Sequence, residues 1–279
     1  MSIRIACHGI TWGRHGFQTA IQEISALGFT GFEAFAFVVD DFGFERMDQF
    51  KQALSERQLK LVALYGGGDL HVAERSDEVI AENVRIARFL AANGACRLVL
   101  GPGRRPVGGP SREHLENFAR CANEIGRRVA DLGVLACAHP HVNTVIERRD
   151  EIDFLMEHTD PRYVAMAADT AHFRKGNPDW PTAEVELLRI YAERIRYVHL
   201  KDWDPSIPPD TAGEGGTAVI RDFVELGEGM VDLAGCVKAL RDGGYAGWLT
   251  IELDYTRRTP MESVAMSQRY LVEQLALSV

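Results

Sequence analysis

The sequence predicts an α/β fold, a (β/α)8 TIM barrel that residues 1–279 form as a single domain. Eight short apolar runs alternate with eight amphipathic stretches, and such an alternation favours a parallel sheet covered by helices. Several runs are continuously apolar, as is typical of parallel strands buried on both faces. A chain of 279 residues also has the length of one such barrel, about 250 residues. Eight repeats favour a closed barrel over a doubly wound sheet.

The boundaries of these elements follow from local sequence signals. Gly28, Gly94 and Gly133 directly follow helical stretches and are expected to end them, whereas Ser111 and Thr182 precede helical stretches as N-cap residues. The predicted strands are residues 3–7, 31–35, 60–64, 97–100, 134–138, 164–168, 195–199 and 248–252. The predicted helices are residues 17–27, 45–58, 77–94, 111–132, 149–158, 182–193, 232–243 and 260–277.

Composition and charge are those of an ordinary globular protein. Hydrophobic residues make up 46% of the chain and charged residues 25%, with a formal net charge of −9 and a sequence pI near 5.5. An acidic surface repels phosphodiester backbones, and the basic segment at residues 103–106 holds only two charges. Nucleic acid is therefore not an expected partner.

The cysteines and the N-terminus indicate a cytoplasmic protein. The five cysteines are odd in number, widely spaced and without a CxxC pair, which argues against a zinc knuckle and a disulfide framework. The apolar run at residues 3–7 is too short for a signal peptide, and no run of 18 apolar residues suggests a membrane span. We expect a soluble protein in a reducing compartment, with no membrane partner.

Several loops are expected at the mouth of the barrel. The longest irregular stretch, residues 201–229, is rich in proline and glycine and follows the seventh strand, so we expect it to act as a lid. Glycine-rich segments at residues 66–69 and 101–103 are expected to be flexible mouth loops. Neither matches a nucleotide-binding pattern, so no nucleotide site is predicted.

Three polar residues stand at the ends of three strands that follow one another in the chain. Asp169, His199 and Glu252 each come directly after a short apolar run, and strand ends are where a TIM barrel places its chemistry. Two carboxylates and an imidazole suit Mn²⁺, Co²⁺, Fe²⁺, Mg²⁺ or Zn²⁺, and the absence of thiolates argues against a purely structural zinc site. We expect these residues to bind a divalent metal, with Glu252 also among the catalytic residues.

The fifth strand ends in His139-Pro140-His141. Pro140 favours an extended chain, in which His139 and His141 lie on the same side. We expect His139 to be the fourth metal ligand and His141 to be a base that contacts the substrate. Glu147 on the same loop is an alternative ligand or base, or an ordinary glutamate at a helix start.

Two further polar residues follow the sixth and seventh strands. His172 lies three residues after Asp169, and a turn there would bring both into one pocket. Lys201 follows His199 and would stabilise a developing oxyanion, or form a solvated pair with Asp202. We expect His172 and Lys201 to contact the substrate.

The first two strands contribute three more candidates for substrate binding. His8 and Trp12 follow the first strand, and Glu33 lies in the second. The Trp12 indole would stack on a sugar ring, although an aromatic residue at this position is also typical of packing.

Five segments resemble the xylose isomerase-like TIM barrel superfamily, which includes sugar isomerases and epimerases, inosose dehydratase and endonuclease IV. The resemblance covers most of the chain, is strongest over residues 134–254 and is closest to the inosose dehydratase branch. The segments are His-Pro-His-Val-Asn-Thr at 139–144, Asp-Thr-Ala-His at 169–172, His-Leu-Lys-Asp at 199–202, Gly-Glu-Gly-Met-Val-Asp at 227–232 and Gly-Tyr-Ala-Gly-Trp at 244–248.

The resemblance implies that a divalent metal is bound by Asp169, His199 and Glu252, together with a residue from the fifth strand. Two departures are visible. Epimerases carry a glutamate where this chain has His139-Pro140-His141, and dehydratases carry Gly-Thr where it has Asn-Thr at residues 143–144. The loop before residue 227 also differs from theirs.

The implied chemistry is proton abstraction α to the carbonyl of a ketose or keto-polyol. The sequence is interpreted first as a metal-dependent sugar isomerase or epimerase, with Mn²⁺ or Co²⁺ as the favoured metal. The alternative is an inosose dehydratase-like lyase that removes water from a keto-inositol or 3-keto sugar. A non-catalytic sugar-binding protein and an endonuclease IV-like repair enzyme are less favoured. The expected partner is a small carbohydrate, and a homo-oligomer is compatible with the sequence.

Overall fold

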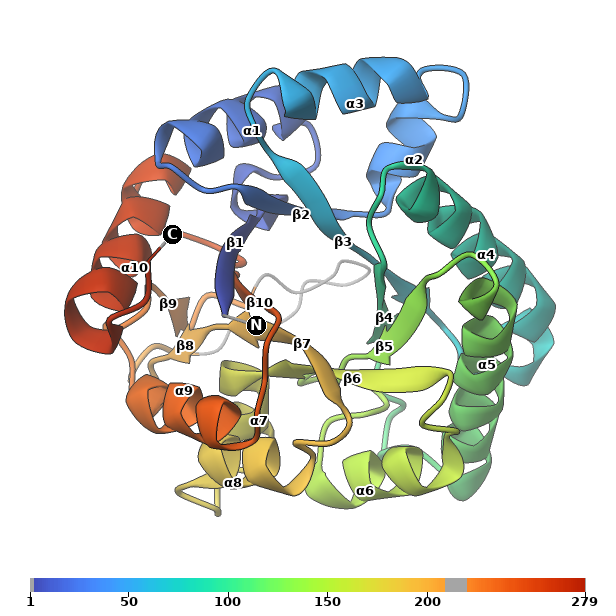
Figure 1. The fold of residues 1–279 in the computed structure, drawn as a ribbon. Coiled ribbons are helices and arrows are strands. Elements are labelled where there is room, and N and C mark those ends of the chain that lie inside the picture. Colours follow the sequence, from blue (N-terminus) through green and yellow to red (C-terminus); the bar gives the residue numbers. More distant parts are fainter. Residues whose placement is uncertain (1–2, 209–219, 279) are drawn as a thin grey trace.

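The computed structural model describes residues 3–208 and 220–278 and confirms the closed barrel of eight parallel strands (Figure 1). Around the barrel the strands follow chain order, and the last pairs with the first. The carboxyl ends of all eight therefore meet at one mouth. The strands are β1 (Arg4–His8), β2 (Gly31–Phe35), β3 (Lys60–Gly68), β4 (Arg97–Pro102), β5 (Leu135–Ala138), β6 (Val164–Asp169), β7 (Ile195–Leu200) and β10 (Trp248–Ile251).

Helices surround the barrel (Figure 1). Eight of them match the predicted ones: α1 (Phe17–Ala26), α3 (Met47–Ser55), α4 (Ser76–Ala92), α5 (Arg112–Ala130), α6 (Arg149–His158), α8 (Ala183–Ile190), α9 (Leu233–Asp242) and α10 (Pro260–Leu275). Two short helices, α2 (Phe37–Phe42) and α7 (Thr170–Gly176), were not predicted. None of the described helices combines the length and apolarity that a bilayer crossing requires.

The two predicted N-caps behave differently. The Ser111 hydroxyl accepts a hydrogen bond from the backbone N–H of His114, and the His114 ring accepts one from the Ser111 N–H, so that α5 begins with a reciprocal cap. Thr182 also directly precedes its helix, but its hydroxyl donates to Glu186 and caps no backbone N–H group.

Two groups of buried apolar residues form the core. The larger combines strand and helix residues, such as Leu98 of β4, Phe89 of α4 and Phe118 of α5. The smaller contains strand residues only, among them Val99 and Tyr197, and is compatible with a filled barrel interior. Leu98 and Val99 fall into different groups because successive side chains of a strand point to opposite faces.

The glycine-rich segments at residues 66–69 and 101–103 were predicted to be flexible loops, but most of their residues belong to strands. β3 runs on to Gly68 and β4 to Pro102, and the two strands stay paired over this stretch, with Gly67 opposite Gly101. Gly67 has φ +96°, and a Cβ atom there would overlap the backbone of Gly101. The glycines of these segments therefore allow two backbones to approach closely. The sequence pattern had instead predicted flexible loops.

The described ends of the segment predicted to be a lid are paired with each other. Asp202–Trp203 (β8) and Phe223–Val224 (β9) form a short antiparallel pair that joins its two ends. Residues 209–219, the middle of the predicted lid, lie outside the described residues.

All five cysteines are free thiols. Cys7, Cys121, Cys137 and Cys236 are buried, whereas Cys96 is exposed. Cys7 and Cys137 lie in β1 and β5, where a buried cysteine packs as a small apolar residue.

Gly67→Ala tests the close approach of β3 and β4. We expect the free energy of unfolding to fall by about 2–3 kcal/mol, since the new methyl group meets both an unfavourable φ and the Gly101 backbone. Gly94→Ala is the matched control, because Gly94 has φ +73° with open space around it, and should cost about 1 kcal/mol. Urea unfolding measures both, and equal losses would contradict the close approach.

Candidate active site

The polar cluster at the barrel mouth follows from the two-residue repeat of the strands. Asp169 and His199 lie two positions after Ala167 and Tyr197, which belong to the small apolar group. Side chains two apart in a strand point to the same face, so Asp169 and His199 project inward above that group. His139 follows β5 in the same way.

Four residues from adjacent strands converge there. Single ligand atoms of His139, Asp169 and His199 all lie within 4.8 Å of one another, and all three residues are buried. Nδ1 of His199 lies 3.9 Å from Oδ2 of Asp169 and 2.7 Å from Oε2 of Glu252. These residues come from the ends of β5, β6, β7 and β10, which are neighbours in the barrel. Imidazole and carboxylate ligands in such a group suit a divalent transition metal.

The four atoms that would bind a metal make no properly oriented hydrogen bond, although Nδ1 of His199 and Oε2 of Glu252 lie 2.7 Å apart. They are Nε2 of His139, Oδ2 of Asp169, Nδ1 of His199 and Oε2 of Glu252, all buried. Nearly all buried polar atoms in proteins have a partner, because losing water without replacement is costly. A bound cation would satisfy all four atoms at once, so the residues present fit a metal ion.

Neighbouring carbonyls orient two of the imidazoles. Nδ1 of His139 lies 3.1 Å from the carbonyl oxygen of Ala167, and Nδ1 of His141 lies 2.7 Å from that of Val142. A carbonyl only accepts, so each Nδ1 carries the proton and each Nε2 keeps its lone pair. This arrangement leaves Nε2 of His139 able to bind a metal and Nε2 of His141 able to accept a proton.

Glu33 and Tyr197 support His199 from below. Oε2 of Glu33 lies 2.9 Å from Nε2 of His199 and accepts a hydrogen bond of 2.7 Å from the Tyr197 hydroxyl. The hydroxyls of Tyr197 and Thr250 are 2.6 Å apart. His199 is thereby held between the carboxylates of Glu33 and Glu252, which fixes the orientation of its ring.

Lys201 is a buried cation among carboxylates. Its Nζ lies 3.0 Å from Asp254, 3.5 Å from Glu252 and 3.8 Å from Asp169. The predicted alternative of a solvated pair with Asp202 is wrong, because the Asp202 carboxylate instead accepts backbone N–H groups at residues 203, 227, 229 and 231. Asp254 was not predicted as a site residue, although its position two residues after Glu252 places it on the same side of an extended chain.

Burial and neighbouring charge set the ionisation of the cluster. Burial raises the pKa of Asp169 to about 6, although the charge of Lys201 opposes this. Burial also disfavours the charged forms of Glu252 and Lys201, but their ionic partners outweigh it, so the pKa of Glu252 falls and that of Lys201 rises. Burial and the charge of Lys201 lower the pKa of His141 to about 4. At neutral pH His141 is therefore neutral and Lys201 charged.

This fold is that of a known family. The family described as xylose isomerase-like TIM barrel matches residues 21–274. The chain belongs to that family. The resemblance predicted from the five segments is confirmed.

Curated relatives match almost the whole chain. The inosose dehydratase of Clostridium botulinum, strain Alaska E43, is 28% identical over 281 residues, covering 94% of this chain and 90% of the relative. The inosose dehydratase of Klebsiella pneumoniae, strain 342, is 28% identical over 282 residues, covering 92% of this chain and 89% of the relative.

Solved structures share the fold at lower identity. A probable 3-DHS dehydratase from Bacillus anthracis has a TM-score of 0.78 at 15% identity and covers 97% of this chain and 99% of its own. The E. coli 3-keto-D-glucoside 4-epimerase has a TM-score of 0.75 at 17% identity, with coverage of 97% and 99%. The IOLI protein, with a bound zinc atom, has a TM-score of 0.77 at 16% identity, with coverage of 98% and 97%. At these identities the similarity shows the fold alone.

His172 lies beside Asp169, as its spacing predicted. Asp169 caps α7 by accepting a 2.8 Å hydrogen bond from the His172 N–H, and Nε2 of His172 lies 3.9 Å from its carboxylate. Ligand atoms of His139, His141 and His172 form a second group within 4.8 Å. Nδ1 of His172 accepts a 3.3 Å hydrogen bond from the Val142 N–H, which ties α7 to the loop after β5.

Glu147 is occupied elsewhere. Its carboxylate accepts a 3.1 Å hydrogen bond from the Asn143 N–H and lies 3.4 Å from the Arg105 guanidinium. Burial raises the pKa of Glu147. These contacts brace the loop after β5, and no ligand atom of Glu147 joins the two metal-competent groups.

The candidates from the first two strands are placed differently. His8 is buried, and its Nε2 lies 3.8 Å from Oε1 of Glu33; neither atom has a hydrogen-bond partner. Trp12 donates a 2.6 Å hydrogen bond to Glu23 of α1 and packs on the larger core group. His8 and Glu33 thus lie in the polar cluster at the barrel mouth. Trp12 makes packing contacts, which were the alternative to stacking on a sugar ring.

Metal analysis tests the ligand set. We expect about one divalent ion per chain in the purified protein, and a loss of affinity of at least tenfold in Asp169→Asn and Glu252→Gln. Glu147→Gln is the matched control and should keep its metal, since Glu147 is paired with Arg105. Elemental analysis after dialysis measures the content. Full retention in both ligand variants, with circular dichroism unchanged, would contradict the site.

Proposed function

We propose that this chain is a divalent-metal-dependent dehydratase that removes water from a keto-inositol or a 3-keto sugar. The observation that carries the proposal is the set of four buried, unpartnered ligand atoms on His139, Asp169, His199 and Glu252. They lie in the same cluster as a neutral imidazole, His141, and a buried ammonium, Lys201. The relatives named inosose dehydratase favour water loss over the isomerisation that the sequence analysis put first.

A divalent metal held by these residues would supply Lewis-acid polarisation of a substrate carbonyl, which acidifies the neighbouring C–H bond. The zinc in the IOLI structure supports a metal in this fold. Zinc, manganese and cobalt all suit a set of imidazole and carboxylate ligands. His139, Asp169, His199 and Glu252 would hold the metal at the ends of β5, β6, β7 and β10.

His141 is the proposed base. The Val142 carbonyl holds the proton on Nδ1, so Nε2 is free to take the α-proton of the substrate. Its low pKa keeps the ring neutral and ready to accept at neutral pH. Glu147, the other candidate from sequence, is engaged by Arg105 and by the Asn143 N–H.

Lys201 is the proposed source of positive charge for the oxyanion that forms on proton abstraction. Three carboxylates within 3.8 Å keep it protonated and fix its position. A cation already in place needs no reorganisation as charge develops on the substrate. Its raised pKa makes it a stabiliser of charge rather than a proton donor.

Epimerisation or isomerisation is the second candidate, because both begin with the same proton abstraction. The fold shared with a 3-keto-D-glucoside 4-epimerase is compatible with it. Epimerisation requires an acid that protonates the opposite face of the substrate, and Glu147 is engaged by Arg105 and by the Asn143 N–H. Dehydration needs no second acid, because the proton that His141 takes from the α-carbon can be passed to the leaving hydroxyl, which departs as water.

A substrate screen in deuterated water separates these reactions. Keto-inositols, 3-keto sugars and ordinary ketoses are incubated with metal-loaded protein and analysed by mass spectrometry. We expect a product lighter by one water from a keto-inositol or 3-keto sugar. Solvent label in a product of unchanged composition would instead establish an isomerase or epimerase. The absence of both loss and exchange with every compound would contradict a catalytic role.

The role of His141 is tested by His141→Gln. We expect kcat to fall by about 10²–10⁴, the usual contribution of a positioned base, while metal content stays at the level of the unmodified protein. Glu147→Gln is the comparison and should have a much smaller effect on kcat. The opposite ranking of the two variants would transfer the role of base to Glu147.

A further inference from the structure

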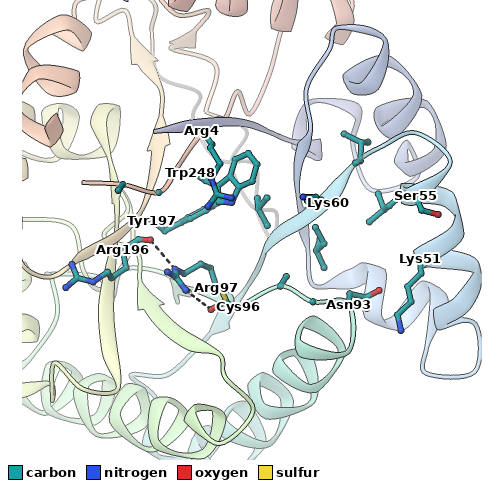
Figure 2. A pocket seen from close by; sticks show the side chains of 18 residues that line it. Arg4, Lys51, Ser55, Lys60, Asn93, Cys96, Arg97, Arg196, Tyr197 and Trp248 are labelled. Carbon is teal, nitrogen blue, oxygen red and sulfur yellow. Dashed lines mark hydrogen bonds between the residues drawn. The ribbon is translucent and has the colours of Figure 1, made fainter. Parts of the chain in front are cut away.

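A cavity lies at the end of the barrel where the strands begin, opposite the polar cluster of the mouth. It has a volume of about 430 Å³ and is lined by residues at the starts of β1, β3, β4, β7 and β10 (Figure 2). Parallel strands begin at one end and finish at the other, so this cavity is separate from the polar cluster at the mouth. The proposed reaction uses none of its residues.

Five cationic side chains line this cavity, and no acidic residue does. They are Arg4, Lys51, Lys60, Arg97 and Arg196. Figure 2 shows them around the cavity, with Trp248 and Tyr197. Among the residues that the structure describes, none of the five lies within 4.0 Å of a carboxylate, although most arginines elsewhere form ion pairs. In a chain of net charge −9, such a local excess of positive charge attracts anions.

Three of these cations are held in place. The Arg4 guanidinium stacks on the Trp248 ring, 4.3 Å from its centroid. Arg97 donates hydrogen bonds of 3.2 Å to the carbonyl oxygens of Arg196 and Cys96. Arg196 donates a 2.8 Å hydrogen bond to the Ile195 carbonyl. These contacts are with neutral groups, so the positive charges stay uncompensated while the side chains lose part of their freedom.

The remaining lining suits an organic molecule. Leu54, Leu61 and Val62 contribute apolar walls, and Asn93 and Ser55 contribute polar groups. The volume falls within the range of small-molecule sites, about 300–1,000 Å³. Guanidinium groups pair with phosphate and carboxylate oxygens through two parallel hydrogen bonds.

We propose that this cavity binds a small anion carrying two or more phosphate or carboxylate groups, at a site distinct from the catalytic cluster. Tyr197 lines the cavity, while its hydroxyl donates to Glu33 beside His199. The buried side chain of Tyr197 thus reaches from the cavity to the polar cluster.

Cys96 provides a direct readout of occupancy. It lines the cavity and is the one exposed cysteine of the five. Its alkylation by iodoacetamide, a neutral reagent, is followed by peptide mass spectrometry at rising concentrations of pyrophosphate or citrate, with glucose as the neutral control. We expect saturable protection of Cys96 at millimolar concentration or below, by pyrophosphate if the site prefers phosphate and by citrate if it prefers carboxylate. Glucose should have no effect.

A double variant tests whether the cations bind the anion. Arg4→Gln with Arg196→Gln leaves the contact of Arg97 with Cys96 intact and should raise the concentration for half-protection at least about tenfold. Arg112→Gln with Arg162→Gln removes the same charge from side chains that are 73% and 74% exposed in other ion pairs, and should change it little. The proposal would be overturned if neither pyrophosphate nor citrate changed the alkylation of Cys96. It would also be overturned if the two double variants were protected equally.

Discussion

The buried carboxylates at the barrel mouth impose the main constraint on this structure. Glu33, Asp169 and Glu252, together with the partly buried Asp254, surround the imidazole of His199 and the ammonium group of Lys201. Buried charges are costly unless they are paired, and here the carboxyl groups outnumber the cationic groups. Burial, followed by the charge of Glu252, raises the pKa of Asp169 against the opposing charge of Lys201, and one oxygen each of Asp169 and Glu252 has no hydrogen-bond partner. A divalent cation is the simplest group that would balance it, and the imidazoles on the same mouth have the free nitrogens to hold one.

The supporting residues depend on the same constraint. The Tyr197 hydroxyl, which also contacts that of Thr250, donates to Glu33 from within the barrel, and Glu33 in turn orients His199. Their short side-chain contacts leave little freedom in the layer beneath the mouth. A ring held on both sides cannot turn away from a ligand. The small residues that fill the barrel below, such as Ala167, leave the space in which these larger groups pack.

The sequence predicted the barrel and most of the mouth, and the reasons are physical. Apolar runs and helical periodicity are local, so eight strands and eight helices could be placed within a few residues of their observed ends. Because the strand ends of a barrel share one mouth, the sequence alone predicted that Asp169, His199 and Glu252 lie together. The close approach of β3 and β4 at Gly67 could not be seen, because glycine permits both a flexible loop and a tight contact. The burial of Lys201 depends on Asp254, which lies more than fifty residues later in the chain.

The loop after β5 explains why the family fold alone does not settle the reaction. Pro140 and the carbonyls of Ala167 and Val142 present two imidazole nitrogens, one to the ligand cluster and one to the adjoining space. A glutamate at this position would add a further negative charge to a site that already has an excess of carboxylates. A neutral imidazole can accept a proton without adding that charge, and the low pKa of His141 means that its ring is neutral at neutral pH. The histidines of this loop therefore suit the abstraction of a proton beside a metal and a fixed ammonium, with the leaving hydroxyl departing from the same substrate.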